Sequence, residues 1–201
     1  MSICRERKQS PGMKSPNKIG PEFSRASFQH FRQSGRMTCG PACLRMISHW
    51  ASGVSRPERF FLREHWWTEA KGMLPQQMLR AIRALATHAL ANGVRLDVEP
   101  LAKSQRRQLL RRPTDLGGGS AVSLLRIDSF AWCRVKLENV GHWIVVTDIK
   151  RVRCRSVLRY VAVCYDPSLP QSDNPYLWDW RSLCAAQLTA RIDIRRDRGW
   201  H

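Results

Sequence analysis

Apolar residues recur at intervals of three and four in two stretches of the first half of the chain, which predicts two helices. In the first stretch, Leu44, Ile47 and Trp50 follow a loop rich in Ser, Gly and Pro. Pro41 is tolerated only in a first helical turn, so this helix begins close to it. The second stretch covers residues 74–90 and is followed by an Asn-Gly pair that ends a helix.

The second half of the chain changes to an alternation of apolar and polar residues, which predicts strands. These strands cover residues 94–98, 121–127, 142–148, 157–165 and 188–194. The polar run 151–156 separates the third strand from the fourth and is typical of a hairpin turn.

Cys39 lies at or just before the start of the first predicted helix. Unpaired backbone N–H groups and the positive end of the helix dipole favour a thiolate there, and such sites lower a cysteine pKa from about 8.5 towards roughly 3.5–7.5. A thiolate attacks carbonyl carbon, so Cys39 is the candidate nucleophile. Cys43 lies one turn inside the helix and is interpreted as a small buried apolar residue.

Gln33 precedes Cys39 by six residues, which is far enough for the loop to fold back. Its side-chain amide would then lie beside the thiol. Together with the backbone N–H of Cys39, that amide would form an oxyanion hole for a tetrahedral intermediate.

His142 opens the third predicted strand, and the question is which carboxylate orients its imidazole. Asp148 lies roughly 20 Å away along the same strand, too far to reach. A hairpin centred on Cys154 returns Asp166 opposite or next to His142, where facing Cβ atoms are about 4.5–5.5 Å apart. We therefore expect a Cys39, His142 and Asp166 triad, and we interpret the other histidines, including His30, as structural.

The run Gln-x5-Cys-Gly-Pro-Ala-Cys-Leu-x-Met-Ile, which begins at Gln33, resembles the active-site segment of papain-like cysteine peptidases. It is closest to the bacteriocin-processing (double-glycine leader) peptidase group and is similar to papain-like proteases that plant-pathogenic bacteria inject as effectors. Asp166-Pro167 is similar to the Asp-Pro found at this place in the same group. Many relatives carry Asp or Glu before the nucleophile, where this chain has Thr38.

The resemblance implies an α+β papain-like fold in which a helical half carries Cys39 and an antiparallel sheet carries His142 and Asp166. It implies a cysteine peptidase in which His142 takes the thiol proton, Asp166 orients the ring and Gln33 stabilises the oxyanion. An acyl-thioester would then be hydrolysed by water. The same triad could serve another thiol acyl-transfer enzyme, such as a deamidase, a transglutaminase-like enzyme or a hydrolase of ubiquitin-like modifiers.

The length of 201 residues suits one domain with a sizeable core and a tail. Residues 1–27 are rich in Ser, Pro, Lys and Arg, so we expect a disordered basic tail. We expect the papain-like domain to cover residues 28–195 and a frayed end to cover 196–201.

The formal net charge of +18 and the pI of about 10.8 ordinarily indicate nucleic acid or an anionic surface as a partner. The basic residues are spread along the chain, however, and no helix-turn-helix or zinc-finger pattern is present. We therefore expect a peptide or protein substrate as the main partner. The alternative from a different class is a basic nucleic-acid-binding protein whose cysteine is incidental.

The seven cysteines are odd in number and irregularly spaced, and they include no Cys-x-x-Cys pair. We expect no disulfide framework, no metal site and no cofactor, and a reducing compartment fits better. No signal-peptide core and no run approaching the roughly 20 apolar residues of a membrane helix is present. We expect a cytoplasmic location, or export without a cleaved signal peptide, including injection into a host cell.

Overall fold

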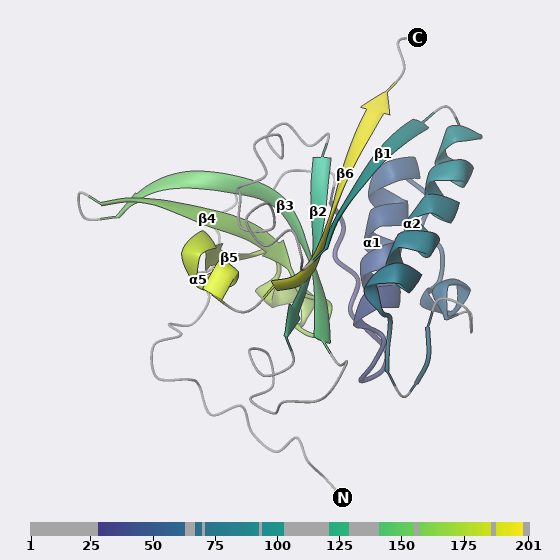
Figure 1. Cartoon of the computed structure of the whole chain (residues 1–201), viewed down its shortest axis with the longest axis horizontal. Coiled ribbons are helices and arrows are strands. Elements are labelled where there is room, and N and C mark those ends of the chain that lie inside the picture. The colour runs from purple at the N-terminus through teal and green to yellow at the C-terminus, as the bar shows by residue number, and fades with distance from the viewer. Residues whose placement is uncertain are drawn as a thin grey trace, which may run out of the picture.

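The computed structural model describes residues 28–62, 67–69, 71–92, 94–102, 121–128, 141–154, 157–185 and 188–198. Helices come first in this part of the chain and an antiparallel six-stranded sheet follows (Figure 1), which confirms the predicted α+β class. The expected tail over residues 1–27 lies outside the described residues.

Both predicted helices are present, with starts close to those expected. Helix α1 (Cys39–Ser52) is capped at its C-terminus by Gly53, whose backbone has the left-handed φ of 73° and whose N–H donates to the carbonyl of His49. Helix α2 (Pro75–Leu90) begins with a proline, and the Gln77 side chain accepts a hydrogen bond from the backbone N–H of Leu74. A short 3-10 helix, η2 (Glu58–Phe61), lies between them.

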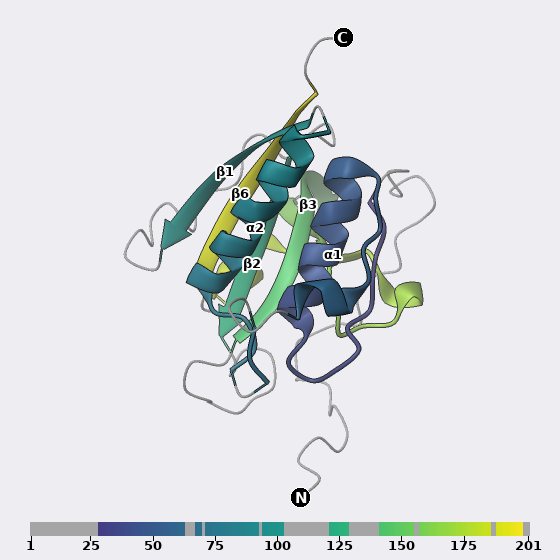
Figure 2. The same cartoon turned by 90° about the vertical axis from the view of Figure 1, so that its right-hand side faces the viewer.

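The sheet has the strand order β1-β6-β2-β3-β4-β5, so the last strand along the chain lies between the first and the second. The strands are β1 (Val94–Ala102), β2 (Ala121–Asp128), β3 (Gly141–Cys154), β4 (Val157–Tyr165), β5 (Tyr176–Asp179) and β6 (Leu188–Arg198). Figure 2 shows α1 and α2 side by side on one face of the sheet. The short helices η4 (Gln171–Asp173) and α5 (Trp180–Ala185) flank β5 in the chain.

Two predicted boundaries differ from the structure. Strand β3 continues to Cys154, which pairs with Val157, so residues 151–154 belong to the strand and not to the hairpin turn expected over the run 151–156. Strand β6 continues to Arg198, which pairs with Val94 of β1, so the frayed end expected from residue 196 is wrong for residues 196–198. In both places many side chains are charged, so the composition does not indicate a strand. The strand forms nevertheless, because backbone pairing does not depend on side-chain polarity.

Alternation along β3 separates two hydrophobic cores, one on each face of the sheet. Trp143 and Val145 pack in the core that contains the buried residues of α1 and α2. Ile144 and Val146 pack in the opposite core together with Leu183 of α5. The strand that carries His142 is therefore held from both sides.

A close approach fixes the start of α1 against the rest of the fold. A Cβ atom on Gly40 would lie 2.7 Å from the Cβ atom of Met73, so only glycine fits at this position. The Met73 carbonyl in turn accepts a hydrogen bond of 2.7 Å from the indole N–H of Trp143. Met73 thereby joins the first turn of α1 to β3, next to His142.

Candidate active site

Cys39 is the first residue of α1, as the sequence predicts, and its side chain is buried with 6% of its surface exposed. Backbone N–H groups in a first helical turn have no partner within the helix, and they stabilise negative charge nearby. The preceding Thr38 does not cap them with its side chain, because its hydroxyl bonds to the backbone of Gly35. The N–H groups beside the thiol therefore keep their capacity to bind an anion.

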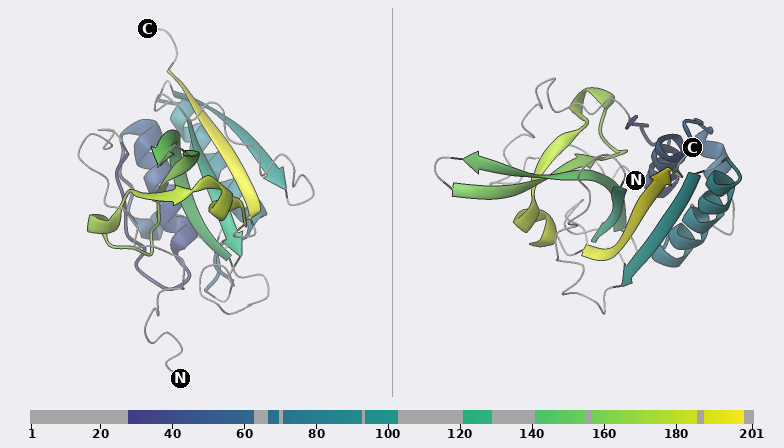
Figure 3. Two further views of the ribbon diagram at one scale, coloured as in Figure 1. Left: turned by 90° about the vertical axis from the view of Figure 1, so that its left-hand side faces the viewer. Right: turned by 90° about the horizontal axis from the view of Figure 1, so that it is seen from above.

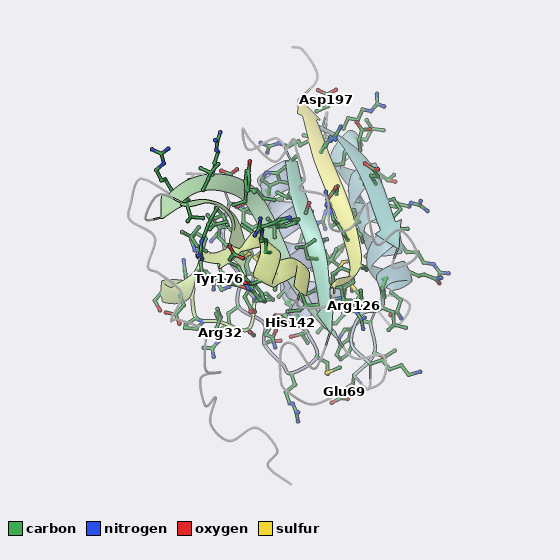
Figure 4. The ribbon with its side chains drawn as sticks, turned by 60° about the vertical axis from the view of Figure 1, so that its left-hand side comes forward. Arg32, Glu69, Arg126, His142, Tyr176 and Asp197 are labelled. Carbon is green, nitrogen blue, oxygen red and sulfur yellow. The ribbon has the colours of Figure 1, made fainter. Side chains whose placement is uncertain are left out.

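The structure brings His142 to both Cys39 and Asp166. The Nε2 atom of His142 lies 2.7 Å from Oδ1 of Asp166, and the Cys39 thiol forms a side-chain hydrogen bond with the same imidazole. Since Nε2 contacts the carboxylate, Nδ1 is the ring nitrogen available to the thiol. His142 is only 1% exposed and lies at the end of the sheet where β3 begins (Figure 4).

The strand register differs slightly from the expected one. Tyr165 pairs with Val145, so Asp166 comes beside Ile144 and reaches His142 diagonally rather than from the directly opposite position. A bulge between Val146 and Asp148 and the later turn shift the register. The contact forms because a diagonal neighbour on the same face is within reach of an aromatic side chain such as that of His142.

Asp166 is held by several hydrogen bonds besides that of His142. Ser168 donates to Oδ1 through its backbone N–H at 2.7 Å and its hydroxyl at 2.6 Å. The Asn174 side chain accepts from the Asp166 N–H at 2.8 Å and donates to its carbonyl at 3.2 Å. The bonds from Ser168 stabilise the charged form of the carboxylate, and the bonds with Asn174 fix the backbone that carries it.

The electrostatics favour an ion pair between Cys39 and His142. Burial opposes charge on Cys39, but the hydrogen bond and charge of His142, with a further hydrogen bond from the backbone of Trp143, lower the pKa of the thiol. Burial likewise opposes charge on His142, but Asp166 and Cys39 outweigh it and raise the pKa of His142 to about 10. Burial opposes charge on Asp166 too, yet His142 and Ser168 lower the pKa of that carboxyl.

Two further cysteines, Cys43 and Cys164, are in a different environment. Burial raises the pKa of the Cys43 thiol well above its ordinary value, and the charges of Cys39 and Asp166 raise it further. Burial also raises the pKa of Cys164, with a further contribution from Asp166. Cys43 is fully buried and donates to the Trp143 carbonyl, in agreement with its interpretation as a buried apolar residue.

Gln33 lies beside the same turn as Asp166. Its backbone N–H donates to the carbonyl of Pro167 at 2.8 Å, and its side-chain Nε2 donates to the carbonyl of Gly35 at 2.8 Å. The Oε1 atom is buried and has no hydrogen-bond partner among the described residues. The amide is thus anchored on one side, and one Nε2 hydrogen stays available, because an amide nitrogen carries two.

Two residues of this site were not recognised as such in the sequence. His30 lies 3.1 Å through Nε2 from the backbone carbonyl of Asp166, and burial lowers the pKa of its ring. Glu58 is buried and accepts hydrogen bonds from the backbone N–H and the hydroxyl of Ser34, the residue after Gln33. For His30 the sequence offers one signal, its short distance from Gln33 along the chain. Nothing in the sequence pattern indicates Glu58.

Within the described residues, no group of three or more His, Cys, Asp and Glu side chains could hold a metal ion. The helices of that part of the chain are also too short or too polar to span a membrane.

The helices, the sheet and the position of the thiol define the class of fold: this chain has the papain-like peptidase fold. A solved structure with the same fold is the crystal structure of a double glycine motif protease from an AMS/PCAT transporter in complex with the leader peptide. The two structures superpose with a TM-score of 0.54 at 14% sequence identity, over 87% of this chain and 96% of that chain. No protein-family model and no curated protein matches the sequence.

Proposed function

We propose that this protein is a cysteine peptidase that hydrolyses peptide bonds through Cys39, His142 and Asp166. The observation that carries the proposal is the buried imidazole of His142, which contacts the Asp166 carboxylate through Nε2 and the Cys39 thiol through its other side. The fold shared with a double glycine motif protease supports it.

The first chemical step is attack by the Cys39 thiolate on the carbonyl carbon of the scissile bond. His142 holds the proton taken from the thiol and then donates it to the leaving amine. Asp166 keeps the ring in the productive orientation and stabilises its positive charge, and Ser168 holds that carboxylate through two hydrogen bonds. The products of this step are a free amine and an acyl-thioester on Cys39.

The oxyanion of the tetrahedral intermediate accepts hydrogen bonds from the backbone N–H of Cys39 and from Nε2 of Gln33. The first is an unpaired donor of a helix N-terminus, and the second retains one hydrogen beyond its bond to Gly35. Losing one such donor ordinarily costs about 10²–10³ in kcat. Water then hydrolyses the thioester, with His142 as general base.

The substrate we propose is a peptide or protein. The solved structure with the same fold contains a leader peptide, which supports a peptide in the corresponding place here. A deamidase or a transferase would use the same thiolate, and the products distinguish the three: a peptidase yields two shorter peptides, a deamidase ammonia, and a transferase a new amide.

The test of the nucleophile is the rate of alkylation by iodoacetamide as a function of pH, with mass-spectrometric assignment of the labelled residue. We expect Cys39 to react well below pH 8 because its pKa is lowered, whereas Cys43 and Cys164 stay unlabelled. The selectivity should disappear in His142→Ala. Reaction of Cys39 with the ordinary pH dependence of a thiol would overturn the proposal.

Turnover is tested on a peptide library, with Cys39→Ala as the inactive control and Cys43→Ala as the matched cysteine control. Cleavage fragments that appear with the wild type and with Cys43→Ala, but not with Cys39→Ala, support a peptidase. Release of ammonia without fragments would instead assign a deamidase.

A further inference from the structure

The β3–β4 hairpin projects beyond the rest of the sheet. Strand β2 pairs with β3 only as far as Val146, and β5 pairs with β4 only from Val161 onward. Residues 151–154 of β3 and 157–160 of β4 pair with each other and, in the described part of the chain, with no other strand. Figures 1 and 3 show this two-stranded end extending away from α1 and α2. We call it the basic ribbon.

Positive charge is concentrated in this hairpin. The chain has five Lys and Arg residues and no acidic one between Asp148 and Asp166. Arg151, Arg153 and Arg159 are all exposed, and Figure 4 shows side chains that end in nitrogen on this part of the sheet. Elsewhere in the sheet, Arg95 and Arg191 each pair with an aspartate. The basic ribbon is therefore a local cationic surface within a generally basic chain.

The cations lie on both faces of the ribbon. Arg151 and Arg153 are two residues apart on β3 and share a face, whereas Arg159 pairs with Val152 and lies on the other face. A flat membrane surface contacts one face of such a ribbon. A groove with a wall of phosphates on each side contacts both, and the major groove of B-form DNA admits a two-stranded ribbon.

Residue types and spacing fit the same partner. The three exposed cations of the ribbon, Arg151, Arg153 and Arg159, are all arginine, whose planar guanidinium binds phosphate through two parallel hydrogen bonds. Arg151 and Arg153 are about 6.8 Å apart along the strand, which equals about two steps of a DNA strand at 3.4 Å each. Val157 and Leu158 are exposed at the tip, 54% and 42%, and can contact thymine methyl groups.

The ribbon is remote from the proposed catalytic residues. Arg153 lies eleven positions after His142 along β3, which corresponds to about 36 Å of extended strand. A ligand on the ribbon therefore does not occupy the site of peptide cleavage.

We propose that the basic ribbon is a binding site for duplex DNA, which enters through its major groove and attaches the enzyme to DNA without blocking Cys39. This second site is independent of the proposed peptidase activity.

The test measures binding of the full chain to a short fluorescent DNA duplex by anisotropy, between about 50 and 200 mM salt. The variant Arg151→Gln, Arg153→Gln, Arg159→Gln is compared with Lys71→Gln, Arg80→Gln, Arg83→Gln, which removes three exposed charges elsewhere. We expect at least tenfold weaker binding for the ribbon variant alone. Its salt-dependence slope should fall by about 2.7, since each phosphate contact contributes about 0.9.

Several outcomes would overturn this proposal. Equal weakening in both variants would assign the binding to net charge, and no binding by the wild type would remove the site. Equal affinity for an RNA duplex of the same sequence would exclude the major groove, because A-form RNA has a deep and narrow one. Ribbon-dependent binding to phosphatidylserine vesicles in place of DNA would assign a membrane. Unchanged Cys39 alkylation shows that each variant is folded and keeps these results separate from the peptidase test.

Discussion

The Nε2 atom of His30 lies 3.1 Å from the backbone carbonyl oxygen of Asp166, and Nδ1 of the same buried ring has no hydrogen-bond partner among the described residues. The carbonyl accepts, so Nε2 carries the proton, and the lowered pKa agrees with a neutral ring. His30 thus holds the backbone of Asp166, in addition to the contacts of its carboxylate.

We expect His30→Phe to lower kcat/KM about tenfold, equivalent to about 1.4 kcal/mol of transition-state stabilisation. The reason is that Asp166 loses a backbone anchor and orients His142 less well. The measurement is the pH profile of Cys39 alkylation, whose acid limb should move to higher pH. His30→Gln keeps a donor and should restore part of the shift; a wild-type profile in His30→Phe would mean a purely structural role.

Glu58 is expected to act on the loop that carries Gln33, because it accepts two hydrogen bonds from Ser34. Glu58→Ala should lower kcat about tenfold, less than the roughly 10²–10³ for complete loss of an oxyanion donor. Cys39 alkylation should be unchanged, since the ion pair with His142 is untouched. Glu69→Ala, at an exposed glutamate, is the matched control and should behave as the wild type. A parallel loss in both variants would contradict this role.

The pKa of His142 makes a prediction for stability. In the folded state the pKa of His142 is raised to about 10, above the ordinary 6.5. The stability that His142 contributes to the folded state is therefore complete below pH 6.5 and is lost as pH rises towards 10. Cys39 opposes this trend because its pKa is lowered, so the measurement uses Cys39→Ala. When Cys39→Ala is unfolded in urea, the free energy of unfolding of this variant should fall above pH 6.5 by up to about 1.4 kcal/mol per pH unit.

The control for that measurement is Cys39→Ala combined with Asp166→Asn. Asp166 is the main contribution that raises the pKa of His142, so the decline above pH 6.5 should become much smaller. An equal decline in both proteins would mean that other groups cause it.

The contact between Gly40 and Met73 predicts a coupled effect on stability. Gly40→Ala should cost about 1–3 kcal/mol, since its Cβ would lie 2.7 Å from that of Met73. Met73→Gly, which has no Cβ atom, should remove most of this penalty in a double-mutant cycle measured by denaturant unfolding. Gly53→Ala is the control: it has the left-handed φ but open space around it, so its cost of about 1 kcal/mol should not depend on residue 73. Additive costs for residues 40 and 73 would disprove the proposed clash.

Several features of the fold are predictable because they depend on near neighbours. The start of α1 at Cys39 follows from a loop, a first-turn proline and a helical period within a dozen residues. The strand that contains His142 follows from alternation. Predicting Asp166 as the partner of His142 required only a hairpin between the two residues. The predicted register was not the observed one, but the two side chains still meet because they are diagonal neighbours on the same face.

Other features depend on residues that are distant in the chain. His30 and Asp166 are 136 positions apart, and Ser34 and Glu58 are 24 apart in a segment without periodicity. The position of β6 between β1 and β2 places Arg198 beside Val94, which no local pattern indicates. The length of the basic ribbon likewise depends on where β2 and β5 stop pairing.

The sequence by itself determined the helix that begins at Cys39, the strand that contains His142 and the α+β order, because capping and side-chain periodicity act over a few residues. Only the tertiary structure decided the register of the β3–β4 hairpin, the contacts of His30 and Glu58 and the projection of the basic ribbon. The physical reason is that strand pairing and side-chain packing join segments far apart in the chain, and shifting the register by one residue turns every side chain to the other face.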